Sequence, residues 1–213
     1  MPASERTKRI AGLILWALIA LLPLGTWSKR LFGPLMGGEA LWWLAVAVIL
    51  SYVVFVERRS LASIGLRRPG LWDMLCGVLC GVALIAGIVF IYGVVFPLFH
   101  LRMNAATLAG IMHTPLWFRV ALVTRAAVME EIVFRGYPIE RFQAWTGSRM
   151  VAALISVVAF TYAHLAAWGA AQLIVAGYGG VVLAVLYLWR RNLWANMLAH
   201  WIADGSGFIF FHP

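Results

Sequence analysis

The chain has 213 residues, of which 63% are apolar and only 12% are charged. Soluble domains carry about 25% charged residues, so an ordinary soluble core is excluded and lipid is the expected solvent. The net charge of +9 could suggest nucleic acid, but the basic residues lie in short clusters between apolar runs. Such clusters set membrane topology. We therefore expect an all-α, polytopic transmembrane helical bundle that contacts the lipid bilayer and binds no nucleic acid.

Seven apolar runs approach the roughly 20 residues that a transmembrane helix needs. We expect about seven spans, with a range of six to eight because closely joined runs can be divided differently. Residues 1–213 are expected to form a single transmembrane domain, with N-terminal spans and loops in 1–115 and the helices that carry the catalytic motifs in 116–213. In chain order, the runs are Ile10–Trp27, Ala40–Val56, Leu71–Phe99, Leu116–Ile139, Met150–Trp168, Gln172–Trp189 and Leu193–Phe211.

The first run follows a basic segment and could pass for a signal peptide. The residues at 23–27, Pro-Leu-Gly-Thr-Trp, make a poor match to the small-residue pattern of a cleavage site. We interpret the run as a retained first span. Most loop arginines and lysines fall on the same side as the N-terminus, which predicts a cytoplasmic N-terminus. The compact size favours a bacterial cytoplasmic membrane.

The third run contains two pairs of residues that are four apart. Gly77 and Gly81 form a small-xxx-small pair, which is typical of closely packed membrane helices. Cys76 and Cys80 share one helix face, but their spacing does not match the common redox or zinc patterns. We expect both cysteines to be reduced core residues.

The fourth run is unusually polar, with Glu130, Glu131 and Arg135 inside it. Each ionised residue near the bilayer centre costs about 2.5–3.5 kcal/mol, so the carboxylates need compensation. Glu131 and Arg135 are four apart and can pair, whereas Glu130 points about 100° away. We expect Arg135 to keep Glu131 ionised and Glu130 to face the bundle interior. The alternative is a single ion-pair network that only stabilises the bundle.

Polar residues also interrupt the fifth and seventh runs. The fifth carries Phe160 and His164, and the seventh carries Asn196, His200 and Asp204 on one stripe. Either set alone is compatible with hydrogen bonds between helices. Together with the paired glutamates they place acids and imidazoles on three spans. Converging ionisable groups in a membrane bundle indicate a functional site, and these groups move protons near neutral pH.

Straight helices would place the polar residues of these runs at different depths. At 1.5 Å per residue, Glu131 lies about 12 Å from Ile139, whereas His164 lies about 21 Å from Met150. His164 would then sit too far outward to meet the others. A shared site therefore requires the fifth helix to begin deeper in the membrane or to tilt.

The three motifs resemble those of the CPBP family, which includes the Rce1-type CAAX prenyl endopeptidases and the bacterial Abi proteins. The resemblance covers roughly Arg119 to Phe208. The last motif position is Asn in the prenyl endopeptidases and Asp here, which weakens any transfer of substrate specificity. The motifs are Glu130-Glu131-x-x-x-Arg135, Phe160-x-x-x-His164 and His200-x-x-x-Asp204.

The resemblance implies an intramembrane peptidase of the glutamic type. Glu130 with His164 would activate a catalytic water, and His200 with Asp204 would stabilise the oxyanion, or Asp204 would orient His200 if it is ionised. The substrate would be a membrane-anchored or membrane-proximal peptide, with C-terminal processing as one form of the reaction, and no cofactor is expected. Glu131 and Arg135 would position the catalytic glutamate. The supporting positions are Glu131, Arg135, Phe160 and Asn196.

Three alternatives remain open from the sequence. His164, His200 and Glu130 could bind zinc with an open position for water, although the His-Glu-x-x-His motif of zincins is missing. The chain could instead be a non-catalytic membrane factor of the same family, with an immunity or partner-binding role. It could also be a proton-coupled transporter, but no inverted repeat supports that function.

Overall fold

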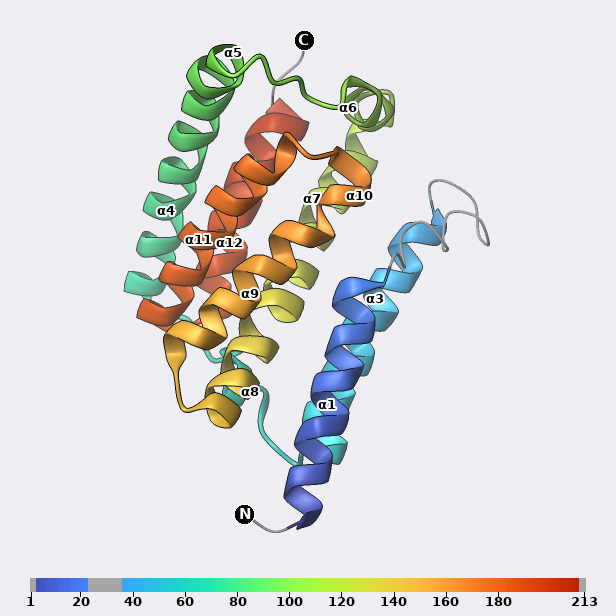
Figure 1. The fold of residues 1–213 in the computed structure, drawn as a ribbon, viewed down its shortest axis with the longest axis vertical. Helices are drawn as coiled ribbons and strands as arrows, with labels where there is room; N and C mark the ends of the chain where they lie inside the picture. Colours follow the sequence, from blue (N-terminus) through green and yellow to red (C-terminus); the bar gives the residue numbers. More distant parts are fainter. Residues whose placement is uncertain (1–2, 23–35, 211–213) are drawn as a thin grey trace.

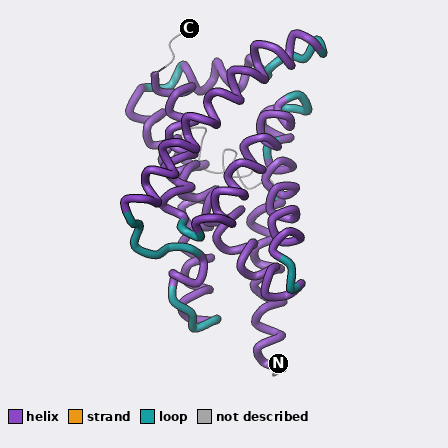
Figure 2. Tube along the Cα trace, turned by 90° about the vertical axis from the view of Figure 1, so that its left-hand side faces the viewer, coloured by secondary structure: helices purple, strands orange, loops and turns teal. Residues whose placement is uncertain are grey.

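The computed structural model describes residues 3–22 and 36–210, and this part of the chain consists of helices and short connections with no strand (Figures 1 and 2). The predicted all-α class is confirmed. The α-helices are α1 (Ala3–Leu21), α3 (Met36–Ser51), α4 (Leu71–Phe90), α5 (Phe96–Leu98), α6 (Ala105–Met112), α7 (Leu116–Glu131), α8 (Tyr137–Thr146), α9 (Arg149–Ala163), α10 (Leu165–Trp168), α11 (Gln172–Arg190) and α12 (Leu193–Gly205). Shorter turns are η1 (Tyr52–Val56), η2 (Leu61–Ile64), η3 (Ile91–Val95), η4 (Ile132–Gly136) and η5 (Ser206–Phe210).

Fewer helices satisfy the length and hydropathy of a membrane span than the seven predicted runs. Within 3–22 and 36–210, four stretches qualify, or five if a pair bent by 120° counts as one broken span. The fourth and seventh runs carry the charged and polar side chains of the predicted site, which lower their hydropathy. The first and seventh runs also extend beyond the described residues, to Trp27 and Phe211. The four stretches are Glu39–Val56, Leu71–Leu98, Arg149–Trp168 and Gln172–Arg190.

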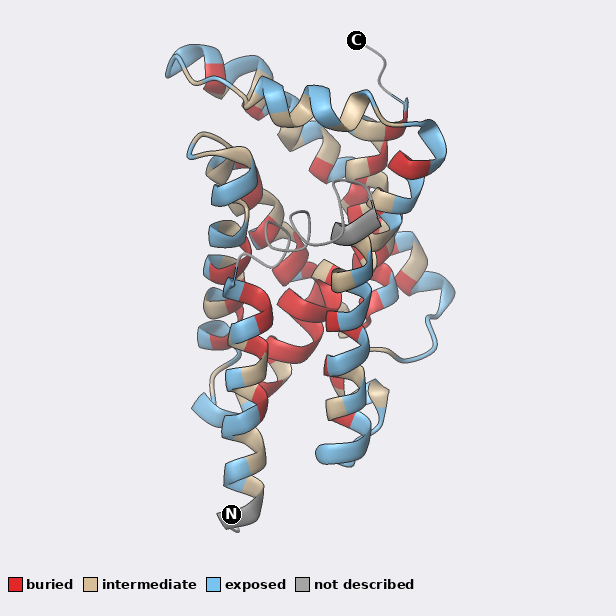
Figure 3. Ribbon diagram, turned by 90° about the vertical axis from the view of Figure 1, so that its right-hand side faces the viewer, coloured by how far each residue is buried: buried red, intermediate tan, exposed pale blue. Residues whose placement is uncertain are grey.

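The outer surface of the bundle fits a lipid environment. Large apolar side chains on α4 face outward, among them Leu75, Leu79 and Val82. In Figure 3, buried positions gather in the middle of the bundle while many outward positions are exposed. A soluble protein rarely exposes a continuous apolar surface of this kind. This pattern supports an integral membrane protein.

The helices form two groups that meet around α7. In Figure 1, α1 and α3 run side by side along one flank, and α4, α11 and α12 form the other. Helix α4 packs closely on α12, since a Cβ at Gly77 would lie 2.7 Å from the Ala195 carbonyl oxygen and one at Gly81 would lie 2.9 Å from the side chain of Ile202. The predicted close packing at this glycine pair is confirmed. It brings the stripe on α12 into the bundle interior.

A π-helical turn and a proline follow directly after the glutamate pair. Pro138 lacks an N–H group, so the carbonyl of Phe134 loses its usual partner four residues later. Ser156 of α9 donates its hydroxyl to that carbonyl. Trp16 of α1 donates to the Val133 carbonyl at 2.6 Å. Two neighbouring helices therefore satisfy the freed backbone groups and fix the turn that carries Arg135.

A polar cluster fixes the start of α12. The Asn192 side chain accepts a hydrogen bond from the Trp194 N–H at 3.0 Å and caps the helix. Asn192 also donates to Asp73 at 3.1 Å, and Arg190 donates to the same carboxylate at 2.9 Å. The cluster joins α4, α11 and α12, so it sets the axial position of His200 two turns further along.

Candidate active site

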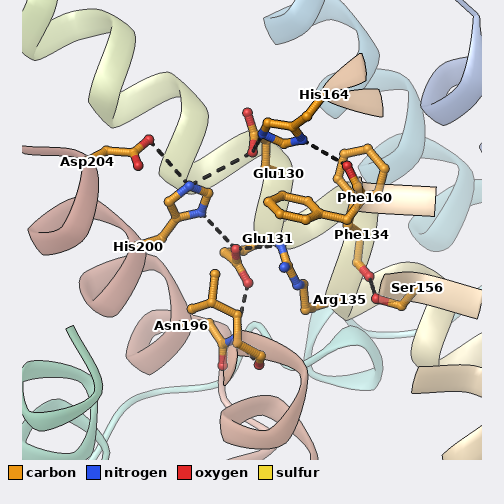
Figure 4. Close-up of polar contacts among 11 residues, drawn as sticks. Glu130, Glu131, Phe134, Arg135, Ser156, Phe160, His164, Asn196, His200 and Asp204 are labelled. Carbon is orange, nitrogen blue, oxygen red and sulfur yellow. Dashed lines mark hydrogen bonds and ion pairs between the residues drawn. The ribbon is translucent and has the colours of Figure 1, made fainter. Parts of the chain in front are cut away.

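Glu131 lies at the centre of a fully buried polar cluster, shown in Figure 4. Its Oε1 accepts hydrogen bonds from Arg135 at 2.9 Å and from His200 Nδ1 at 2.8 Å. Its Oε2 accepts from Asn196 Nδ2 at 3.1 Å. The same Asn196 amide group donates to the Leu183 carbonyl of α11 at 2.7 Å. Glu131 thus joins α7, η4 and α12, and neither of its oxygens is free.

Glu130 has a different environment, although it is the adjacent residue. Its side chain is 16% exposed, whereas that of Glu131 is fully buried. The Glu130 Oε2 atom is itself buried and has no hydrogen-bond partner among the described residues. A buried carboxylate oxygen without a partner is energetically costly and is a feature of functional sites. Glu130 therefore differs from Glu131 in having a buried oxygen that no hydrogen bond of the described residues satisfies.

His164 reaches the same depth as Glu130. Its Nδ1 lies 2.8 Å from the Phe160 carbonyl, and its Nε2 lies 3.9 Å from Glu130 Oε2. The residue follows the end of α9, at the break before α10. Helix α9 runs obliquely across the bundle in Figure 1, so His164 does not lie too far outward. The tilt resolves the depth problem that straight helices would create.

His200 contacts all three acids of the site. While Nδ1 contacts Glu131, Nε2 lies 3.4 Å from Asp204 Oδ2 and 3.9 Å from Glu130 Oε2. Both ring nitrogens therefore face carboxylate oxygens and can act as donors. This arrangement connects the buried Glu131 cluster to the Glu130 side of the site.

Phe160 packs against both Arg135 and His164. The Arg135 guanidinium lies 4.0 Å from the centre of its ring, a cation–π contact that partly replaces solvation of the buried charge. The His164 ring centre is 4.5 Å from that of Phe160. Phe160 thus has the supporting position that the sequence indicated.

A cavity of about 1070 Å³ opens onto the reactive side of this cluster. Glu130, His164, His200 and Asp204 all line it, and most of the remaining wall is apolar. Glu131 and Arg135 lie outside the lining. A cavity of this size can hold a peptide segment of several residues, and its apolar wall suits substrates from the membrane.

The zinc alternative has no matching ligand set in the described residues. Catalytic zinc sites place three protein ligands about 2.0–2.2 Å from the metal. Within 3–22 and 36–210, no group of three or more His, Cys, Asp or Glu side chains is arranged to hold a metal ion. Glu130 Oε2 lies 3.9 Å from both His164 Nε2 and His200 Nε2.

The structure brings all eight predicted site residues together, with one difference in how they are connected. The family resemblance implied that Glu131 and Arg135 would position Glu130. Glu131 instead contacts His200, Asn196 and Arg135, and no hydrogen bond or ion pair joins it to Glu130. The two glutamates lie on the same helix, α7, but their side chains point in different directions. Glu131 therefore orients the imidazole of His200 through Nδ1.

Two ion pairs were missed because their partners are distant in sequence. Glu39, at the start of α3, pairs with Arg125 of α7 at 3.0 Å. Glu140 of α8 contacts Arg191 and Tyr187, which lie about 50 residues further along the chain. The sequence did show an acidic residue at a helix start, Glu39, and an arginine inside an apolar run, Arg125. Their spacing along the chain could not show that the two residues pair.

Comparison with known proteins supports the interpretation of the motifs. Residues 112–206 match the family of type II CAAX prenyl endopeptidase Rce1-like proteins. The matched segment contains every predicted site residue, from Glu130 to Asp204. No curated protein and no solved structure matches the chain. The family match supports membership of the CPBP and Rce1-like group and, in general, a CAAX-type protease activity in the membrane.

Proposed function

Since residues 112–206 are Rce1-like, we propose that this chain is a glutamic-type intramembrane endopeptidase that hydrolyses peptide bonds in membrane-associated substrates. The observation that carries the proposal is the unpartnered Glu130 Oε2, which lies 3.9 Å from both His164 Nε2 and His200 Nε2 in the wall of a large cavity. A carboxylate and two imidazoles around one point can activate water and stabilise the charge that develops.

Water activation is assigned to Glu130 with His164. Two hydrogen bonds of about 2.8 Å can bridge atoms up to about 5.6 Å apart. One water molecule can therefore contact both Glu130 Oε2 and His164 Nε2. As the water oxygen bonds to the scissile carbonyl carbon, its proton passes to Glu130. Glu130 then gives this proton to the leaving amine as the C–N bond breaks.

Stabilisation of the oxyanion is assigned to His200. Glu131 holds the ring through Nδ1, so the Nε2 donor points toward Glu130 and the cavity. A donor fixed before the reaction stabilises a tetrahedral oxygen at little reorganisation cost. Asp204, 3.4 Å from Nε2, orients the ring from the other side. Asp204 therefore acts as a positioning residue in this scheme.

The test compares Glu130→Gln with wild type and with Glu5→Gln, a matched change of an exposed carboxylate outside the site. New C-termini in membrane proteins are quantified by mass spectrometry in a deletion strain that carries each version. We expect Glu130→Gln to lower the rate of cleavage by about 10²–10⁴-fold, since general base catalysis contributes roughly this factor. Glu5→Gln should cleave like wild type.

The same experiment separates the alternative functions. Unchanged cleavage products in Glu130→Gln would refute the glutamic mechanism. Full biological function with no cleavage in either strain would favour a non-catalytic membrane factor. Loss of activity of the purified protein in excess chelator, restored by zinc, would favour the metal-dependent version. Proton uptake coupled to solute transport would favour a transporter.

A further inference from the structure

Basic residues gather at the end of the bundle where α1 begins, the lower end in Figure 1. A small depression there lies between α1, the segment after η1 and α8. None of its lining residues lines the large cavity, so the depression is separate from the site described above. Six charged side chains line it: Lys8, Arg9, Arg59, Arg141, Glu5 and Glu57.

Both acids of the depression are already paired. Arg141 donates from Nε to the two carboxylate oxygens of Glu57 at 3.0 and 2.9 Å. Lys8 donates to Glu5 at 3.1 Å. The acids therefore offset two of the four cations that line the depression, and net positive charge remains.

The other basic residues of this region have no acidic partner within hydrogen-bond reach. Arg9 donates to the neutral carbonyl of Ala144 at 3.1 Å. Arg58 and Arg59 are exposed, and neither side chain forms a hydrogen bond or an ion pair with the described residues. A guanidinium binds a phosphate group through two parallel N–H···O bonds. The region therefore presents guanidinium groups that an anionic ligand can reach.

The backbone turns sharply between η1 and these two arginines. Arg58 has a φ of +54°, in the left-handed region that favours glycine. The Arg59 N–H donates to the Val53 carbonyl at 3.0 Å and closes the turn. Backbone strain of this kind occurs often at ligand sites. The turn thus holds a strained, exposed cation directly after η1.

The basic residues adjoin the part of the surface that faces lipid. Arg6, Ile10 and Ile14 are four residues apart and share one face of α1, and the two isoleucines are 45% and 56% exposed. Phe55 of η1 is 75% exposed and precedes Arg58 by three residues. In both segments an arginine therefore follows exposed apolar side chains along the surface. Hydrocarbon gives way to charged headgroups in this manner at a membrane surface.

We infer that Arg6, Arg9, Arg58 and Arg59, the N-terminal basic patch, bind the phosphate headgroup of an anionic phospholipid whose acyl chains lie along α1 and η1. Clusters of basic residues beside a membrane helix attract such headgroups. A free phosphate would engage only the arginines, whereas a lipid also covers the apolar side chains beside them. Because Arg9 links α1 to α8, a bound lipid holds the group of α1 and α3 against the rest of the bundle.

The test measures thermal unfolding of the full chain in nanodiscs of phosphatidylcholine, with or without phosphatidylglycerol. A ligand that binds the folded state raises the Tm. We expect phosphatidylglycerol to raise the Tm by about 4 °C, and native mass spectrometry should show the lipid retained on the protein. An unchanged Tm would overturn the proposal.

A pair of double variants separates a defined site from general attraction to positive charge. Arg58→Gln/Arg59→Gln should lose most of the rise in Tm. Arg68→Gln/Arg149→Gln removes two other exposed arginines, near the starts of α4 and α9, and should keep the rise. Equal losses in the two double variants would overturn the proposal, because any basic residue would then serve.

Two further measurements identify the ligand and the role of the turn. Inorganic phosphate added to phosphatidylcholine nanodiscs should leave the Tm unchanged, and a rise equal to that with phosphatidylglycerol would assign the patch to a soluble anion instead. Arg58→Gly removes a cation and also relieves the positive φ. It should raise the Tm in phosphatidylcholine and reduce the gain from phosphatidylglycerol. An undiminished gain in Arg58→Gly would exclude Arg58 from the site and contradict the proposal.

Discussion

Glu131 and Glu130 are adjacent in sequence but have different surroundings: Glu131 lies in the core of the bundle, and Glu130 lies in the wall of the cavity. The Glu131 side chain is fully buried and both its oxygens accept hydrogen bonds from η4 or α12. The Glu130 side chain borders a cavity, and its buried Oε2 has no hydrogen-bond partner among the described residues, with two imidazole nitrogens 3.9 Å away. One step of about 100° around α7 therefore separates a carboxylate held in the core from the carboxylate that we propose to be catalytic.

The difference shows how a membrane bundle can keep an acid reactive. Glu131, Arg135 and Asn196 pair their charges and dipoles with one another, which offsets the cost of burial. That cluster holds His200, and His200 points at Glu130. The buried cluster thus fixes His200 beside Glu130, and none of its hydrogen bonds uses the Glu130 carboxylate.

The sharpest way to break this comparison is the same substitution at both positions. Glu131→Gln leaves the buried Arg135 charge without its partner, so we expect a loss of about 3–5 kcal/mol in the free energy of unfolding. Glu130→Gln should change it by less than about 1 kcal/mol, since no hydrogen bond is lost. Unfolding in mixed detergent micelles measures both values. Equal destabilisation by the two variants would show that the glutamates belong to one structural network.

A smaller effect is expected at Asn196, which belongs only to the structural side. Asn196→Ala removes the donor to Glu131 Oε2 and to the Leu183 carbonyl, and leaves both acceptors buried. We expect a loss of about 1–3 kcal/mol in unfolding free energy. Peptide cleavage by the folded fraction should persist at a reduced rate. A neutral effect on stability would contradict the role assigned to this amide.

The smallest effect is expected at Asp204, on the cavity side of His200. Asp204→Asn keeps the shape of the side chain but removes the charge that faces His200 Nε2. We expect cleavage to fall by about tenfold, which corresponds to roughly 1.4 kcal/mol, with an unfolding midpoint close to that of wild type. A loss as large as that of Glu130→Gln would instead give Asp204 a direct part in the reaction. Initial rates on one substrate, compared with melting curves, distinguish the two.

Much of this site could be predicted from the sequence because local spacing decides it. Glu131 and Arg135 pair at i,i+4, and Asn196, His200 and Asp204 share one stripe of α12, as helical periodicity requires. The close approach of α4 to α12 at Gly77 and Gly81 also followed from small residues at that spacing. The division of the chain at 115 and 116, the cytoplasmic N-terminus and the bacterial membrane stay predictions.

What the sequence by itself determined is the helical membrane bundle and the set of polar residues that its spans must bring together, because hydropathy and the 3.6-residue period act within a single helix. Only the tertiary structure decided which groups meet: the tilt of α9 that brings His164 to Glu130, the assignment of Glu131 to His200, and the pairing of Glu39 with Arg125. These contacts depend on the tilt and axial offset of one helix against another. Such offsets arise from packing over the whole interface, and no local pattern in the chain encodes them.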